Sequence, residues 1–179
     1  MRVVSGTAKG RRLQAPPGSD VRPTSDRVRE AVFDILGSLG GVATLTVTDL
    51  FAGTGALGIE ALSRGAAAAT FVDHDPAALG SLRVNLVSTG LYSRATVVEA
   101  DVLSWLPGSS ECHVAFADPP YTFADWDELV TGLRADLVVI ESNHEVPAPP
   151  GWSTEKTRHY GGTVLTLLRP ASPDESEGS

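Results

Sequence analysis

A glycine-rich stretch at residues 49–58, DLFAGTGALG, has the residue types and spacing of a loop that binds a cofactor. Gly53, Gly55 and Gly58 form a G-x-G-x-x-G pattern, which is typical of a dinucleotide-binding turn. Such glycines let the backbone approach a ligand, and the N-terminus of the following helix offers N–H groups to negative charge. Asp49 argues against a pyrophosphate, because its carboxylate repels phosphate but can pair with an ammonium group. A tight turn without a ligand stays open as the alternative.

Two further acids are expected to end the next strands along the chain. Asp73 follows an apolar stretch, and a carboxylate there can accept hydrogen bonds from both hydroxyls of a ribose. Its spacing of 20 residues from Gly53 suits a dinucleotide or another cofactor that contains adenosine. Asp101 ends VVEAD, where an acid can bind an adenine amino group, although capping of the next helix is a comparable explanation. Asp75 is expected to cap a helix.

The motif DPPY at residues 118–121 is the most specific feature of the sequence. It follows a nearly unbroken apolar run, and its two prolines fix an extended bend that has no N–H donors. The Asp118 carboxylate and nearby carbonyl oxygens can then accept hydrogen bonds, while Tyr121 offers a flat face for stacking. Together these groups suit a planar ring that carries an exocyclic NH2 group. The alternative is a proline-stiffened loop with an ordinary surface tyrosine.

Alternating strands and helices are predicted around these motifs. Strands are predicted at 46–51, 69–73, 95–100, 112–117 and 136–142, helices at 24–39, 56–65, 75–90, 101–106 and 126–133, and a hairpin at 152–160 and 162–169. This order predicts an α/β fold: a Rossmann-like, doubly wound and mostly parallel sheet with a C-terminal antiparallel hairpin. In such a sheet, ligands bind beyond the carboxyl ends of the strands, where all the motifs lie.

The composition indicates one soluble α/β domain. The chain has 179 residues, of which 42% are hydrophobic and 20% charged. It has no apolar run of membrane-spanning length and no secretory signal pattern. A single cysteine excludes an internal disulfide. We therefore expect a cytoplasmic protein.

Basic residues are concentrated at the N-terminus of an otherwise acidic protein. The net charge is −8, yet residues 1–30 carry seven basic and three acidic side chains, against seven and nineteen in the remainder. This asymmetry indicates a basic arm that contacts a polyanion, and a solvated basic segment is the alternative. We predict an arm or hairpin over 1–22, the main domain over 23–169 and a disordered acidic tail over 170–179.

The motifs DLFAGTG, FVDHD, EAD and DPPY, in this order on this pattern, resemble those of class I S-adenosylmethionine (SAM) methyltransferases that act on exocyclic amines. RVVSGTAKGRRL and RPTSDRVREAVFDIL are similar to the arm and first helix of the bacterial 16S rRNA guanine-N2 methyltransferases, the RsmD family that modifies guanine 966. The resemblance covers residues 2 to about 169. DPPY is shared with adenine-N6 and glutamine methyltransferases, whereas RPTSDRVRE is more selective.

The resemblance implies which residues hold the cofactor. Asp49 and the Phe51–Gly55 turn would hold the methionine end of SAM, Asp73 its ribose and Asp101 its adenine, with His74 beside the adenine. The implied cofactor-binding residues are Asp49, Phe51, Ala52, Gly53, Thr54, Gly55, Asp73, His74, Asp101 and Val102.

The resemblance also implies the reaction, a methyl transfer from SAM to N2 of guanine 966 in 16S rRNA, on the 30S subunit or its assembly intermediate. Asp118 and the Pro119 carbonyl would accept the two amine hydrogens, which aligns the nitrogen lone pair with the methyl group. Tyr121 would hold the base, which must leave its stack. The residues expected to contact RNA phosphates are Lys9, Arg11, Arg12, Arg22, Arg27 and Arg29. We expect a monomer without a metal site.

Three other functions compete with rRNA methylation as explanations of the sequence. A SAM methyltransferase that acts on DNA adenine N6 or protein glutamine keeps the cofactor but leaves RPTSDRVRE unexplained. A non-catalytic RNA-binding module on the same scaffold leaves DPPY unexplained. A nicotinamide oxidoreductase needs a substrate domain and a proton-transfer residue, and the sequence shows neither.

Overall fold

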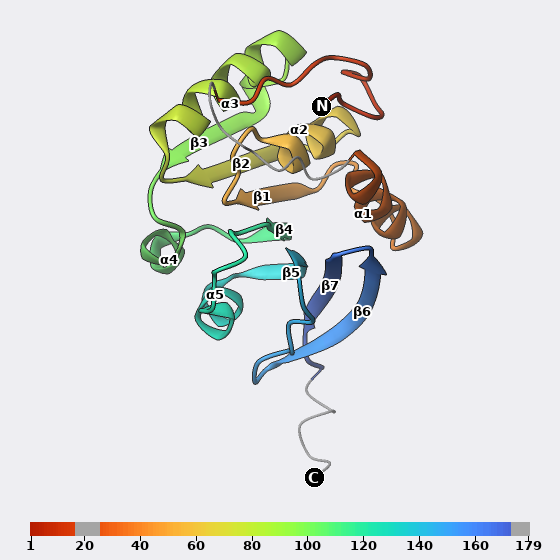
Figure 1. The fold of residues 1–179 in the computed structure, drawn as a ribbon, viewed down its shortest axis with the longest axis vertical. Helices are drawn as coiled ribbons and strands as arrows, with labels where there is room; N and C mark the ends of the chain where they lie inside the picture. Colours follow the sequence, from red (N-terminus) through yellow and green to blue (C-terminus); the bar gives the residue numbers. More distant parts are fainter. Residues whose placement is uncertain (17–25, 173–179) are drawn as a thin grey trace.

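The computed structural model describes residues 1–16 and 26–172, which contain a seven-stranded sheet. The strand order is β3-β2-β1-β4-β5-β7-β6 (Figure 1). Strands β1 to β5 are parallel, and β7 runs antiparallel to both of its neighbours. The predicted sheet with its C-terminal hairpin is therefore confirmed. The strands are β1 (Thr46–Leu50), β2 (Ala68–Asp73), β3 (Ala95–Glu99), β4 (Cys112–Ala117), β5 (Ala135–Ser142), β6 (Trp152–Tyr160) and β7 (Thr163–Pro170).

Helices cover both faces of the sheet because successive strand residues point to opposite sides. On β4, Phe116 belongs to the apolar core beneath α1, α2 and α3, whereas Ala117 belongs to the core beneath α4 and α5. Within the described residues, no helix is long and apolar enough to cross a membrane. The helices are α1 (Asp26–Ser38), α2 (Ala56–Ser63), α3 (Pro76–Thr89), α4 (Val102–Trp105) and α5 (Trp126–Gly132), with 3₁₀ turns η1 (Tyr92–Arg94) and η2 (Leu106–Gly108).

The predicted boundaries after residue 45 agree with the structure to within two residues. Helix α3 shows the reason, because local capping chemistry sets both of its ends. The Asp75 side chain accepts a hydrogen bond from the Ala77 N–H at 2.9 Å, and Pro76 occupies the first helical turn. Gly90 then ends the helix in the left-handed conformation, with φ 74°. The start signals at residues 23–25 lie outside the described residues.

The strand order creates a switch point between β1 and β4. From β1 the chain moves outward to β2 and β3, and then crosses back to β4 on the other side of β1. The loops that leave β1 and β4 therefore diverge and open a crevice at the carboxyl ends of these strands. The glycine-rich turn and DPPY are the two walls of that crevice.

The N-terminal arm, residues 1–16, folds back on itself. Arg2 and Arg12 form an isolated antiparallel bridge, and the Val3 N–H donates to the Arg11 carbonyl at 2.9 Å. The arm lies beside α2 and α3 (Figure 1). The predicted division into an arm over 1–22, a main domain and a tail stays a prediction, because residues 17–25 lie outside the described residues. The acidic tail from residue 173 onward lies outside the described residues.

Candidate cofactor and substrate site

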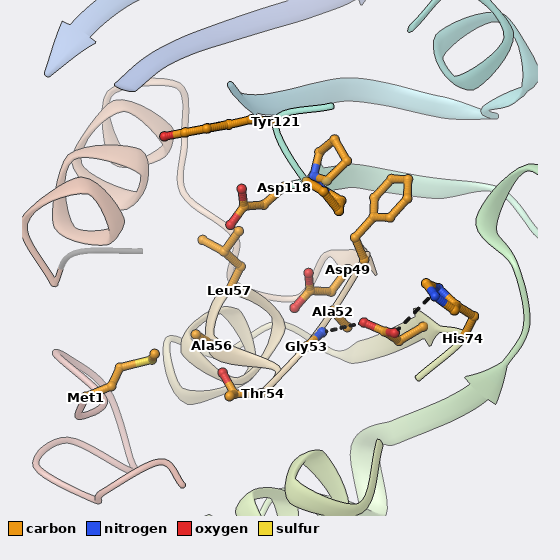
Figure 2. A pocket seen from close by; sticks show the side chains of 14 residues that line it. Met1, Asp49, Ala52, Gly53, Thr54, Ala56, Leu57, His74, Asp118 and Tyr121 are labelled. Carbon is orange, nitrogen blue, oxygen red and sulfur yellow. Dashed lines mark hydrogen bonds and ion pairs between the residues drawn. The ribbon is translucent and has the colours of Figure 1, made fainter. Parts of the chain in front are cut away.

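A cavity of about 450 Å³ opens at the carboxyl ends of β1, β2 and β4. It is lined by parts of the 49–57 loop, by Asp73 and His74, by residues 118–121 and by Met1 (Figure 2). Its volume lies within the range of about 300–1,000 Å³ that is usual for small-molecule sites. Motifs that are far apart in the sequence therefore meet in one cavity.

The glycine-rich turn owes its shape to backbone conformations that favour glycine. Gly53 and Gly55 have φ values of 55° and 79°, and Phe51 has a φ of 56°, which is uncommon for a residue with a side chain. A Cβ on Gly55 would come within 2.2 Å of Leu82, and one on Gly58 within 2.3 Å of the Phe71 ring. The turn thus bends the backbone toward the cavity while α2 packs tightly against the sheet.

Only part of the predicted cofactor loop lines the cavity. Asp49, Phe51, Ala52, Gly53 and Thr54 do so, whereas Gly55 is the N-cap of α2 and lies against Leu82 instead. The role that the structure shows for Gly55 is conformational.

Asp49 lies at the floor of the cavity and is 3% exposed. Its Oδ2 accepts a hydrogen bond from the Gly58 N–H at 2.8 Å, in the first turn of α2. The pKa of Asp49 is raised to about 8, chiefly because the side chain is buried and also because Asp118 and Asp73 carry nearby negative charge; the hydrogen bond from the Gly58 N–H acts in the opposite direction. Negative charge at Asp49 is therefore costly until a cation enters the cavity.

Asp73 joins the loops that follow β1 and β2. One carboxylate oxygen accepts from the Gly53 N–H at 2.8 Å (Figure 2). The other accepts from the Asp75 N–H at 2.9 Å. These two bonds fix the carboxylate at the cavity edge. The His74 ring lies beside it, with Nδ1 4.0 Å from Asp73 Oδ1, and its side chain is 73% exposed.

Asp101 and Val102 do not line this cavity. The Asp101 carboxylate accepts a hydrogen bond from the Ser104 N–H at 3.0 Å and so caps α4. The Val102 side chain is buried in the core beneath α4 and α5. Helix capping, which the sequence left open for Asp101, is therefore present, and a contact of either residue with the cofactor stays a prediction.

The DPPY loop forms the opposite wall. Asp118 is half-buried and faces the cavity above Asp49 and Leu57, and the Pro119 ring is buried (Figure 2). Tyr121 is 39% exposed at the rim.

An aromatic cluster supports this loop from behind. The Phe123 ring lies edge-on to Phe51 with centroids 5.2 Å apart and edge-on to Trp126 at 4.9 Å. The Phe123 N–H also donates to the Pro120 carbonyl at 2.9 Å, which closes a turn after DPPY. Packing and proline stiffness thus hold the loop in place.

The basic residues divide into three groups. Lys9, Arg11, Arg12 and Arg27 are exposed, and Arg22 lies outside the described residues. Arg29 is 0% exposed, and the prediction that it contacts RNA is wrong because no phosphate can reach it. Its side chain points from α1 into the core. The guanidinium group donates one hydrogen bond to the Arg2 carbonyl and another, of 2.9 Å, to Asp26 Oδ1. Its Nε lies 3.6 Å from Glu60 Oε2.

Some lining residues were not predicted from the sequence. Leu57 stands in the first turn of α2, and Pro120 lies within DPPY. Their positions next to predicted site residues were the available signal. Nothing in the sequence indicates that the arm folds back far enough to place Met1 at the cavity (Figure 2).

The chain is similar to known proteins over nearly its whole length. Residues 1–169 match the family described as "Conserved hypothetical protein 95". The "Ribosomal RNA small subunit methyltransferase D" of Escherichia coli strain K12 is 35% identical, with 99% of this chain and 93% of that protein covered. The "Putative rRNA methyltransferase YlbH" of Bacillus subtilis is 38% identical, with 93% and 91% covered.

A solved structure supports the same relationship. The "Putative methyltransferase yhhF from Escherichia coli" superposes with a TM-score of 0.83 and 34% identity, over 95% of this chain and 97% of that one. The chain therefore belongs to the RsmD family of class I SAM-dependent methyltransferases.

Proposed function

We propose that this protein transfers a methyl group from SAM to the exocyclic N2 of guanine 966 in 16S rRNA, on the 30S subunit or an assembly intermediate. The observation that carries the proposal is the position of Asp118, which faces Asp49 across one cavity at the β1–β4 switch point. The similarity to an E. coli protein named as a ribosomal RNA small subunit methyltransferase supports the choice of substrate.

The donors and acceptors of the cavity fit SAM. Asp73 is fixed by the Gly53 and Asp75 N–H groups at a strand end where a carboxylate binds ribose hydroxyls. Asp49 lies deep in the cavity and can pair with the ammonium group at the methionine end. When bound, SAM supplies an electrophilic methyl group on a sulfonium centre. Asp101 and Val102 would meet the adenine at the end of β3.

The residues after β4 would position the acceptor amine. The amine of guanine is a poor nucleophile, because its lone pair is delocalised into the ring. The Asp118 carboxylate and the Pro119 carbonyl would accept its two hydrogens and turn the lone pair toward the methyl group. Orientation of this kind contributes several kcal/mol or more. Asp118 or water then takes the proton that the amine loses.

Tyr121 and the basic surface would hold the RNA. The target base must leave its stack to enter the cavity, and the exposed Tyr121 ring at the rim offers a face on which it can stack. Lys9, Arg11, Arg12 and Arg27 would contact phosphates, together with Arg22. The protein would act as a cytoplasmic monomer.

Methylation of defined ribosomal particles tests this function. The protein is incubated with radiolabelled SAM and 30S subunits that lack the modification, and the label is mapped on 16S rRNA. Label at N2 of guanine 966 is expected. Label at an adenine, in DNA or in protein would show that the acceptor is different, and no transfer to any acceptor would support a non-catalytic RNA-binding module.

A further inference from the structure

The arm is held on the main domain by buried side chains that bind its backbone. The Glu60 carboxylate accepts from the Val4 N–H at 2.8 Å and from the Ser5 N–H at 2.9 Å. The Ser63 Oγ accepts from the Ala8 N–H at 2.9 Å. Both side chains come from α2, the helix that begins at the cofactor loop. The arm is therefore docked by specific hydrogen bonds.

One buried side chain contacts both the arm and the cofactor loop. Asn85, on α3, is 0% exposed. Its Oδ1 accepts from the Gln14 N–H at 2.8 Å, and its Nδ2 donates to the Gln14 carbonyl at 3.0 Å. The same Nδ2 donates to the Thr54 carbonyl at 3.0 Å. The amide thus ties both backbone groups of one arm residue to the glycine-rich turn.

The bond to Thr54 reaches the wall of the cofactor cavity. Thr54 lines the cavity and lies between Gly53 and Gly55, whose φ values are 55° and 79°. The other end of the arm reaches the same cavity, where Met1 points toward Thr54 and Ala56 (Figure 2). The Leu13 N–H donates to the Met1 carbonyl at 3.1 Å, so a backbone hydrogen bond joins the two ends of the arm.

We propose that Asn85 is a positioning residue that couples docking of the basic arm to binding of SAM in the glycine-rich turn. A ligand that fixes the Thr54 backbone stabilises the Asn85 side chain in the position from which it also binds Gln14. A docked arm, in turn, favours the SAM-binding conformation of the turn. Because the coupling is a free energy between two sites, it acts equally in both directions. The inference uses the SAM site and rests on the proposed function only where RNA is concerned.

Hydrogen exchange on the full chain tests the coupling without RNA. Amide exchange is measured for residues 1–16 with and without S-adenosylhomocysteine, the demethylated product. In the natural protein, the product should slow exchange at Val4, Ala8 and Gln14 by about fivefold or more. In Asn85→Ala this slowing should disappear at product concentrations that still saturate the cavity. Full slowing in Asn85→Ala, or none in the natural protein, would overturn the proposal.

A matched control separates coupling from simple loosening of the arm. Ser63→Ala removes two bonds to the arm, the one accepted from the Ala8 N–H and the one donated to the Ser5 carbonyl, but no bond to the cofactor loop. Exchange in the arm should become faster in Ser63→Ala, and the product should still slow it. If Asn85→Ala does not fold, Gln14→Pro removes the arm's N–H donor at an exposed position and should weaken the product-dependent slowing; an unchanged slowing there counts against the proposal.

RNA binding gives the reciprocal measurement. The product should raise the affinity of the natural protein for under-methylated 30S subunits by about fivefold or more, and it should not do so for Asn85→Ala. If the product protects the arm but neither protein binds the particle, the coupling stands and the proposed RNA substrate fails. If both proteins bind and the product strengthens both equally, the role of Asn85 is refuted.

Discussion

The two walls of the cavity are built in different ways. On the β1–β2 side, the carboxylates of Asp49 and Asp73 accept backbone hydrogen bonds from Gly58 and Gly53, each at 2.8 Å. On the β4 side, residues 118–121 are held in place by the rigidity of their two prolines and by the edge-to-face packing of Phe123 against Phe51 and Trp126. At the first wall, backbone N–H groups bind the carboxylates directly, whereas aromatic rings and a backbone hydrogen bond from Phe123 to Pro120 support the second wall.

This difference indicates a division of labour. A wall whose carboxylates already hold backbone N–H groups is organised before a ligand arrives, as suits a cofactor that binds in one pose. A wall with an exposed Tyr121 at the rim suits an acceptor base that enters from a large substrate. Damage on the β4 side should therefore reduce turnover, whereas damage on the β1–β2 side should reduce cofactor affinity.

The largest effect is expected from Asp118→Ala. Loss of this acceptor should lower kcat for methyl transfer by about 100-fold to 1,000-fold, because the amine is no longer oriented. The Kd of SAM, measured by calorimetry, should change little. Asp118→Asn keeps a carbonyl acceptor and should lose less activity. Equal losses of turnover and SAM affinity in Asp118→Ala would contradict the proposal that the β4 wall acts on turnover and the β1–β2 wall on cofactor affinity.

Asp73→Ala should give the reverse pattern on the other wall. The substitution removes the proposed ribose acceptor and leaves the Gly53 N–H without its side-chain partner. Charged hydrogen bonds of this kind are worth about 1.5–3 kcal/mol, so the Kd of SAM should rise by about 10-fold to 100-fold. Asp75→Ala is the matched control, since this neighbouring carboxylate caps α3, does not line the cavity and should matter much less for SAM. An unchanged Kd in Asp73→Ala would contradict the assignment.

Asp49→Asn tests the buried acid of the same wall through pH. Burial raises the Asp49 pKa from 3.8 to about 8, so between these values the folded protein binds more protons than the unfolded chain. The stability of the cofactor-free natural protein should therefore fall as pH rises through this window. The Asp49→Asn side chain does not titrate, so the stability of this variant should not fall in the same way. Its Tm should exceed that of the natural protein by about 5 °C at pH 8 and be similar to it at pH 4.

The same variant should bind SAM more weakly, because the ammonium group loses its carboxylate partner. Thermal melts with and without SAM measure both effects. A Tm difference that is constant from pH 4 to pH 8 would show that Asp49 does not titrate in this window.

The sequence predicts the parts of the site that depend on local patterns. Strand ends followed by Asp73 or DPPY are visible because apolar runs stop at polar or proline residues. Long-range packing is not visible in this way. In the sequence, Arg29 looks like any other basic residue of the RVRE segment at 27–30. Only the fold shows that it lies on the buried face of α1, next to Glu60 of α2. The approach of Met1 to the cavity depends likewise on a tertiary contact that no local pattern encodes.

The smallest effects are expected from single charges of the arm, and Arg29 supplies the contrast. Arg12→Gln removes one exposed charge and should weaken RNA binding, with the slope of log K against log salt reduced by about one and Tm unchanged. Arg29→Met removes a buried charge that lies 3.6 Å from Glu60, so it should lower Tm. Its salt slope should stay close to that of the natural protein. A reduced salt slope in Arg29→Met with an unchanged Tm would mean that Arg29 meets phosphate in the complex, and that the arm leaves its docked position when RNA binds.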